Sequence, residues 1–197
     1  MHFVYIAAAV LPAFIILIYS YKQDSFPEPP KIVFKTFLFG CATVLGIDLI
    51  ISELDAFSEN NLSGETYNFF DTFIRAAFLE EFFKFCVIVF YCTRKTAFDE
   101  PMDGLVYGAT AALGFAMAEN FDYVSNAANF GPTWQDVAWT RAFLTAPMHA
   151  ACGIFIGFSF SYYYFYNRNV LFLFLGLITA IFFHFIYNYG YFNLIVI

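Results

Sequence analysis

The sequence is short of charged residues. Asp, Glu, Lys and Arg make up only 13% of its 197 residues, whereas an average soluble domain contains about 25%. Since 61% of the residues are hydrophobic, we do not expect a soluble globular protein, and the chain is too apolar to be disordered. Among the charged residues, basic ones are the fewer, with nine Lys and Arg against sixteen Asp and Glu. The resulting net charge of −7 argues against a nucleic-acid partner.

Glycine and proline are ordinary in number, at 11 and 7, which excludes collagen-like and low-complexity proteins. Cysteine is sparse as well, and no two cysteines form a CxxC pair. All four lie in or beside apolar runs, so we expect buried free thiols rather than a disulfide or a cysteine metal site. These are Cys41, Cys86, Cys92 and Cys152.

Long apolar blocks fill most of the chain. Six of them have roughly the 20 residues that a helix needs to cross a ~30 Å hydrocarbon core. We therefore predict an all-α, polytopic integral membrane helix bundle that forms a single transmembrane domain over residues 1–197. A cleaved signal peptide is a weaker interpretation of the first block, because no basic region precedes it. The predicted spans cover residues 2–21, 32–52, 69–92, 102–120, 139–166 and 169–194.

The breaks between these spans differ in charge. The second and fourth breaks, 53–68 and 121–138, contain no Lys or Arg, and 53–68 is acidic. Short cytoplasmic loops are enriched in Lys and Arg, so the odd breaks are predicted to be cytoplasmic and both termini extracytoplasmic. The basic residues of the odd breaks are Lys22, Lys31, Arg94, Lys95 and Arg168.

Several ionisable or amide side chains lie inside the predicted spans, where such groups are costly and usually functional. The pair Glu80 and Glu81 lies about eleven residues from the external end of its span, roughly 16–18 Å deep. Asp71 and Arg75 lie nearer that end at i,i+4 spacing, which indicates a structural ion pair. The candidate site residues, all predicted in the outer half of the membrane, are Glu80, Glu81, Lys84, Glu119, His149, His184 and Asn188.

The spacing within the third span suggests different roles for the two glutamates. Glu80 and Lys84 have the favourable i,i+4 order for an ion pair, while Glu81 projects about 100° further round the helix. One carboxylate would then be paired, and the other would face a cavity as a general base. Carboxylates and imidazoles together suit hydrolysis by an activated water, with a His or Asn stabilising the oxyanion.

Two alternatives to this chemistry stay open. Glu81, His149 and His184 offer three N/O ligands of the kind found in catalytic zinc sites, although an HExxH motif is absent. The cofactor is therefore either none or zinc. Proton-coupled transport also uses membrane-embedded Glu and His residues, but the sequence shows no internal repeat to support alternating access.

Four motifs carry a resemblance to a known family. The chain contains EEFFK at 80–84, DGLVYGATAALGFAMAEN at 103–120, RAFLTAPMHAACGIFIG at 141–157 and HFIYN at 184–188. In this order they resemble the PrsW family of intramembrane proteases, which is related to the CAAX-protease and bacteriocin-processing enzymes.

The resemblance implies a peptidase of a prokaryotic plasma membrane. Its expected substrate is a membrane-anchored protein, typically an anti-sigma factor, cut on the extracytoplasmic side. The family's paired glutamates correspond to Glu80 and Glu81, its basic partner to Lys84, and its two membrane histidines to His149 and His184. Glu119 and Asn188 are expected to orient the histidines. Glu81 is the first candidate to activate water and Glu80 the second. Some members of the wider superfamily are non-catalytic scaffolds, which leaves a scaffold as a further alternative.

Overall fold

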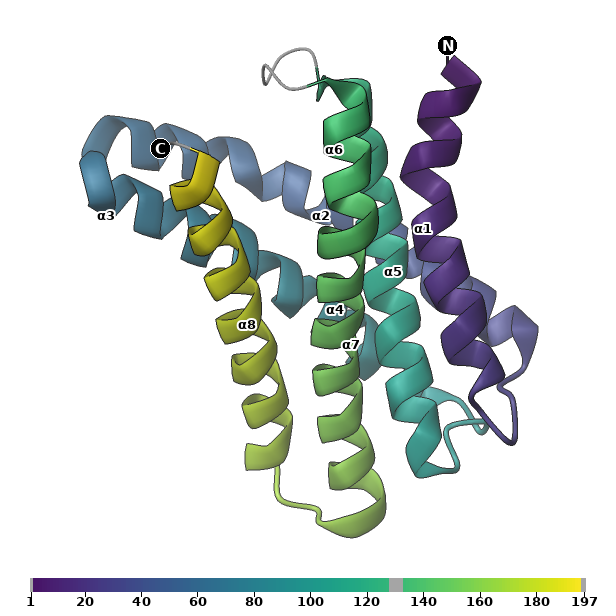
Figure 1. The fold of residues 1–197 in the computed structure, drawn as a ribbon. Coiled ribbons are helices and arrows are strands. Elements are labelled where there is room, and N and C mark those ends of the chain that lie inside the picture. The colour runs from purple at the N-terminus through teal and green to yellow at the C-terminus, as the bar shows by residue number, and fades with distance from the viewer. Residues whose placement is uncertain (1, 128–132, 196–197) are drawn as a thin grey trace.

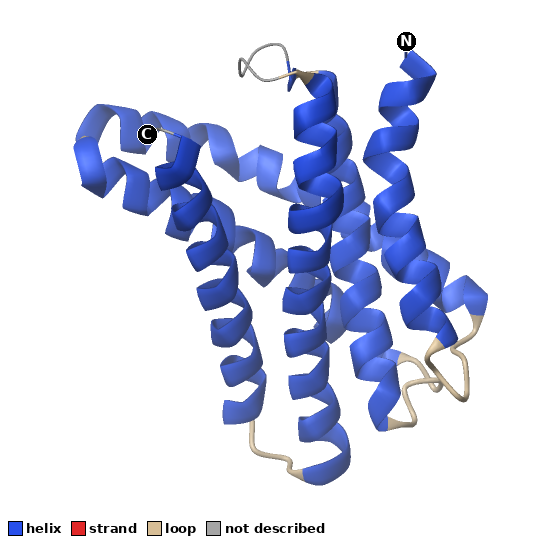
Figure 2. Ribbon diagram, in the orientation of Figure 1, coloured by secondary structure: helices blue, strands red, loops and turns tan. Residues whose placement is uncertain are grey.

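The computed structural model describes residues 2–127 and 133–195, and all regular structure in these ranges is helical. Figure 2 shows the described chain as helices joined by short loops, which confirms the predicted all-α class. The main helices are α1 (His2–Lys22), α2 (Pro30–Asn61), α3 (Gly64–Phe69), α4 (Leu79–Phe90), α5 (Pro101–Ser125), α6 (Trp134–Thr140), α7 (Ala146–Ser161) and α8 (Leu171–Ile195).

At some junctions the chain does not leave the helical conformation but continues as π-helix. The segments η1 (Phe70–Phe78), η4 (Arg141–Thr145) and η5 (Tyr162–Tyr166) are π-helical, and η2 (Cys92–Arg94) is a 3₁₀ turn. As a result α3, η1 and α4 form one continuous helical rod, and α6, η4, α7 and η5 form another.

The second break was predicted as a loop over 53–68, and this is wrong. Helix α2 continues to Asn61 and α3 begins at Gly64, so only Leu62 and Ser63 separate them. The acidic stretch marks a polar surface but not a non-helical chain, because Glu, Leu and Ala favour helix. The chain reverses instead at Gly64, whose φ of 55° suits glycine.

The fourth break is also shorter than predicted. Helix α5 runs five residues past the expected end at 120, to Ser125, and α6 begins at Trp134. Residues 128–132 of this break lie outside the described residues.

The outer surface of the bundle is apolar. Leu45 and Leu49 on α2 are 67% and 83% exposed, and Ile178 on α8 is 60% exposed. Among the described residues, three helical stretches are long and apolar enough to cross a membrane, Pro30–Asn61, Trp134–Tyr166 and Leu171–Gly190, and Ile6–Lys22 is a shorter apolar helix. Six crossings and external termini stay predictions.

Helix α5 lies at the centre of the bundle, with α1, α2 and α7 packed around it. Figure 1 shows α1, α5 and the α6–α7 rod nearly parallel, while α2 and the α3–α4 rod cross behind them and α8 flanks α7. Small residues make this packing close. A Cβ on Gly108 would collide with the carbonyl oxygen of Gly153, and a Cβ on Gly153 would collide with that of Gly108. The two backbones therefore touch, as in small-residue helix interfaces of membranes.

This contact predicts the effect of adding one methyl group. We expect Gly108→Ala to lower the free energy of unfolding by about 1–3 kcal/mol, because the methyl overpacks a backbone contact. Unfolding of the purified protein in detergent measures this. Gly190→Ala is the matched control, since nothing lies within 4 Å of its added Cβ. Equal effects of the two changes would contradict the close α5–α7 contact.

Candidate active site

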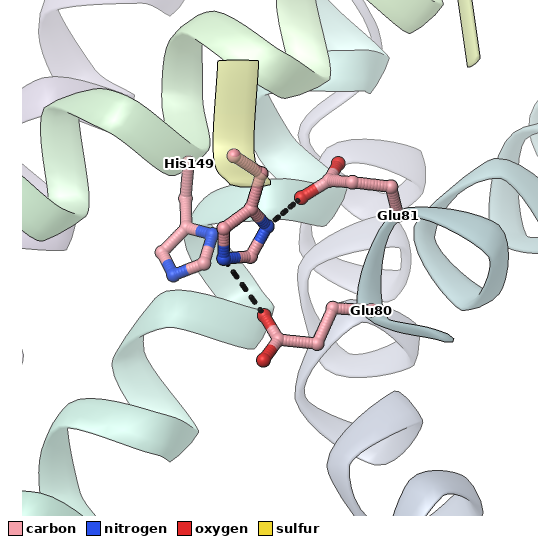
Figure 3. A group of neighbouring side chains, drawn as sticks. Glu80, Glu81 and His149 are labelled. Atoms are coloured by element: carbon pink, nitrogen blue, oxygen red, sulfur yellow. Dashed lines mark hydrogen bonds and ion pairs between the residues drawn. The ribbon is translucent and has the colours of Figure 1, made fainter. Parts of the chain in front are cut away.

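Four predicted site residues from three helices converge inside the bundle. Glu80 and Glu81 come from α4 and His149 from α7 (Figure 3). His184 comes from α8. One ligand atom from each lies within 4.8 Å of the others. All four residues are buried, and the exposed fraction of the whole residue lies between 0% for Glu81 and 8% for Glu80.

The ammonium of Lys84 lies at the centre of this group and is 1% exposed. Its Nζ donates to Oε1 of Glu81 at 2.8 Å and to Nδ1 of His149 at 3.0 Å, and it lies 3.5 Å from Oε2 of Glu80. It also stacks 4.0 Å above the ring centroid of Phe115 on α5, a cation–π contact that favours a desolvated cation. Lys84 therefore joins α4 to α5 and α7.

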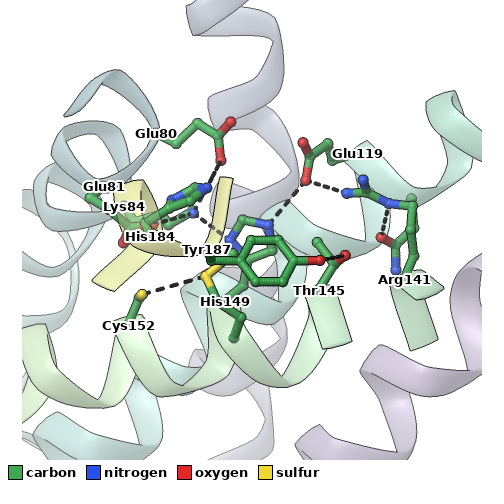
Figure 4. A network of polar contacts seen from close by, with 12 residues as sticks. Glu80, Glu81, Lys84, Glu119, Arg141, Thr145, His149, Cys152, His184 and Tyr187 are labelled. Carbon is green, nitrogen blue, oxygen red and sulfur yellow. Dashed lines mark hydrogen bonds and ion pairs between the residues drawn. The ribbon is translucent and has the colours of Figure 1, made fainter. Parts of the chain in front are cut away.

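The partners of His149 define its tautomer. An ammonium group can only donate hydrogen bonds, so Nδ1 of His149 must accept the one from Lys84. In a neutral ring the proton is then on Nε2, which donates to Oε2 of Glu119 at 3.1 Å. Figure 4 shows His149 between these two partners. The structure therefore places Glu119 in contact with Nε2 of His149.

The two glutamates are held differently. The predicted ion pair of Glu80 and Lys84 is present, at 3.5 Å, but Glu81 is not left free, because the ammonium of Lys84 lies closer to it, at 2.8 Å. Oε1 of Glu81 also accepts from Nδ1 of His184 at 2.7 Å. Oε2 of Glu80 has only the contact with Lys84 and a 3.8 Å approach to Nε2 of His184. The firmly held carboxylate is therefore Glu81.

Arg141 was missed by the sequence analysis. Its Nη2 donates to Oε2 of Glu119 at 2.5 Å and its Nε donates to Oδ1 of Asn120 at 2.6 Å. Its guanidinium also lies 4.1 Å from the ring centroid of Tyr123. The available signal was an arginine inside a predicted span, eight residues before His149, with Glu119 as the acid it would balance.

Two π-helical segments directly precede the site residues. Segment η1 ends two residues before Glu80, and η4 ends four residues before His149. Pro147 accounts for the second, because it lacks the N–H that an α-helical carbonyl at 143 would need. Such segments shift the phase of a helix and are frequent at functional sites.

Asn188 and Tyr187 occupy the turn of α8 after His184. Asn188 is half-buried and hydrogen-bonds none of the described side chains, so the structure does not join it to the cluster. The hydroxyl of Tyr187 lies 2.6 Å from that of Thr145 at the end of η4, a contact visible in Figure 4. This contact ties α8 to the α6–α7 rod beside the histidines.

The predicted pair of Asp71 and Arg75 is confirmed, at 3.3 Å. Arg75 also contacts Asp55 of α2 at 2.6 Å, which links α2 to η1 away from the histidine cluster. Because these side chains are about one third exposed, their ion pairs are worth little, at about 0–1 kcal/mol.

Comparison with known proteins agrees with the motifs. A family model described as PrsW family intramembrane metalloprotease matches residues 28–196. The chain belongs to the PrsW family. Two relatives named Protease PrsW are those of Geobacillus kaustophilus, 36% identical over 154 residues, and Bacillus subtilis, 33% identical over 157 residues. These matches cover 78% and 79% of this chain and 64% and 67% of the relatives.

The chain spans slightly under two thirds of the Geobacillus kaustophilus relative and about two thirds of the Bacillus subtilis one. A third relative named Protease PrsW, from Oceanobacillus iheyensis, is 33% identical over 154 residues. That match covers 78% of this chain and 66% of the relative. No solved structure matches the chain.

The description of the PrsW family implies a metal ion, and the residues present fit one. Two carboxylates and two imidazoles within 4.8 Å are a zinc-type donor set. Oε2 of Glu80 and of Glu81 are buried and accept no hydrogen bond from the described residues. If fully ionised, the carboxylates of Glu80, Glu81 and Glu119 outnumber the cations of Lys84 and Arg141 by one. In this structure Nδ1 of His149 accepts a hydrogen bond from the ammonium of Lys84.

The burial of the Arg141 pair predicts a large effect on stability. We expect Arg141→Gln to lower the free energy of unfolding by about 3 kcal/mol, because Glu119 loses a partner inside the bundle. Arg75→Gln is the matched control and should cost less than about 1 kcal/mol. Unfolding of both variants in the same detergent is the measurement. A loss for Arg75→Gln as large as that for Arg141→Gln would show that Arg141 is not specially buried.

Proposed function

We propose that this PrsW-family protein is an intramembrane endopeptidase that hydrolyses a peptide bond of a membrane-anchored protein. The observation that carries the proposal is the convergence of Glu80, Glu81, His149 and His184 in a buried cluster. Carboxylates and imidazoles in one enclosed site supply the base, the acid and the hydrogen-bond donors that amide hydrolysis needs. The relatives named Protease PrsW support the same reaction class.

Glu80 is the better placed general base, and this revises the expectation for Glu81. Its side chain is 11% exposed and its Oε2 has only long contacts, at 3.5 and 3.8 Å. The side chain of Glu81 is 0% exposed and shares Oε1 between Lys84 and His184, so it is less accessible to water than Glu80. In this proposal Glu80 removes a proton from water, and Glu81 holds Lys84 and His184 in place.

The histidines and their neighbours complete the proposed mechanism. Glu81 accepts from Nδ1 of His184, so a neutral ring presents an unprotonated Nε2 on the side of Glu80. This nitrogen is placed to take up a proton and pass it to the leaving amine. Asn188 adds an amide donor one turn along the same helix. His149 is oriented by Glu119, which Arg141 holds in turn. Lys84 balances the glutamate charges.

A zinc-dependent version of this reaction is the second candidate, favoured by the donor set and its spacing. Glu80, Glu81, His149 and His184 would hold the ion. When bound, such an ion acts as a Lewis acid on a carbonyl oxygen and lowers the pKa of bound water. The roles of Glu119 and Arg141 as orienting residues are the same in both versions.

The substrate proposal rests on the surroundings of the site. A cavity of about 460 Å³ lies between η1 and α8, and every residue that lines it is apolar. It includes Phe78, next to the glutamate helix, and Ile181, one turn before His184. An apolar segment such as the membrane anchor of a protein suits this lining. We further propose an anti-sigma-factor-like substrate cut on the extracytoplasmic side of a prokaryotic plasma membrane, in line with the predicted topology and the bacterial relatives.

The proposal predicts the outcome of conservative substitutions at the glutamates. We expect Glu80→Gln to reduce cleavage of a membrane-anchored substrate in liposomes at least ~100-fold, because the general base is lost. Glu81→Gln should reduce it too, through loss of the contacts to Lys84 and His184. Glu65→Gln on α3 is the control, since Glu65 is exposed and should leave cleavage unchanged.

Three outcomes would point elsewhere. Cleavage at the parental rate by folded Glu80→Gln and His149→Ala variants would refute the peptidase site. Proton-linked uptake without a cleaved product would indicate a transporter, and neither activity would indicate a scaffold. A chelator titration with metal analysis separates the two versions of the mechanism: loss of cleavage that zinc restores assigns an ion, and full activity of metal-free protein assigns water activation to Glu80 alone.

A further inference from the structure

A second cluster of carboxylates lies at the N-terminal end of α5, sixteen residues before Glu119 and so roughly 24 Å away along the same helix. It consists of Asp24 and Glu28 from the loop between α1 and α2, and Glu100 and Asp103 at the start of α5. One carboxylate oxygen each of Asp24, Glu100 and Asp103 lies within 4.8 Å of the others. Figure 2 shows these two connections at the same end of the molecule. We call these four residues the carboxylate cluster.

Two oxygens of the carboxylate cluster are buried without a donor. Asp24 is 5% exposed and Asp103 is 0% exposed. Oδ2 of Asp24 and Oδ1 of Asp103 accept no hydrogen bond from any described N–H or hydroxyl group. The other oxygen of each is used locally: Asp24 accepts from the amide of Phe26, and Asp103 from those of Asp99 and Glu100. A buried carboxylate oxygen left in this way is costly unless a cation or proton meets it.

No side-chain cation supplies that charge. Of the ion pairs among the described residues, none includes a member of the carboxylate cluster. Glu28, 3% exposed, accepts from the hydroxyl of Tyr107, which fixes it against the wall of α5. Glu28 thus adds a further carboxylate beside Asp103, with no counter-charge among the ion pairs of the described residues.

We propose that the carboxylate cluster binds a hard divalent cation, Mg²⁺ or Ca²⁺, which joins the α1–α2 loop to the start of α5. Its candidate ligands are all oxygens, the donors that these two ions prefer. This distinguishes the cluster from the histidine-containing site. A cavity of about 740 Å³ lined by Glu28, Glu100 and neighbouring loop residues gives an ion a path from solvent.

The test is cation binding by the full chain, purified in detergent and stripped with EDTA. Equilibrium dialysis against Mg²⁺ and, separately, Ca²⁺ should show one saturable site per chain for at least one of the ions. Asp24→Asn should weaken that binding at least ~10-fold, because a charged ligand is lost while the acceptor for Phe26 is kept. Asp99→Asn is the matched control, an exposed neighbouring carboxylate, and should bind as the parent does.

Two further arms keep the result decisive. If Asp24→Asn does not fold, Glu100→Gln tests the same ligand set with a side-chain oxygen retained for capping. His149→Ala should keep the binding, since its imidazole belongs to the other cluster. Absence of saturable binding, or binding that His149→Ala removes and Asp24→Asn leaves intact, would overturn the proposal.

Discussion

One buried ammonium, that of Lys84, is the interaction on which the candidate active site depends. Removing a charge from water costs several kcal/mol, and the surrounding bundle is mostly apolar. The cost is met by Glu81 at 2.8 Å and by His149 at 3.0 Å, one on the same helix and one on α7. Because His184 of α8 shares the same Glu81 oxygen, the positions of three helices are coupled through one cation. Displacing α7 or α8 would remove a hydrogen-bond partner from the buried ion pair of Lys84 and Glu81.

The coupling extends across the bundle through alternating donors and acceptors. His149 contacts both Lys84 and Glu119 of α5. Arg141 contacts both Glu119 and Asn120, and the amide of Asn120 donates to a carbonyl of α1. These contacts are short because α5 and α7 touch at Gly108 and Gly153. The polar network therefore depends on the glycine packing, because the glycines set the separation of α5 and α7 at which the hydrogen bonds between these helices form.

The sequence predicted the class of the fold and the residues that meet, for the same physical reason. In an apolar chain every deep ionisable group needs a partner, so a few residues stand out from the sequence alone, namely Glu80, Glu81, Lys84, Glu119, His149 and His184. The predicted loop at 53–68 was wrong because the polarity of its side chains indicates exposure to solvent and does not determine the backbone conformation. The expectation that Lys84 would pair with one glutamate only was wrong, because its ammonium reaches the acids at both i−4 and i−3. Which of the two it holds more closely depends on histidines from two other helices.

Two adjacent glutamates do different work because they share a helix turn but not a direction. Successive side chains are about 100° apart, so when Glu81 points to Lys84 and His184, Glu80 points toward the edge of the cluster, where 11% of its side chain stays exposed. The inner acid then stabilises the lysine and the imidazole, which leaves the outer acid loosely held next to both. Under the proposed mechanism, a single glutamate could not both hold Lys84 and His184 in place and accept a proton from water.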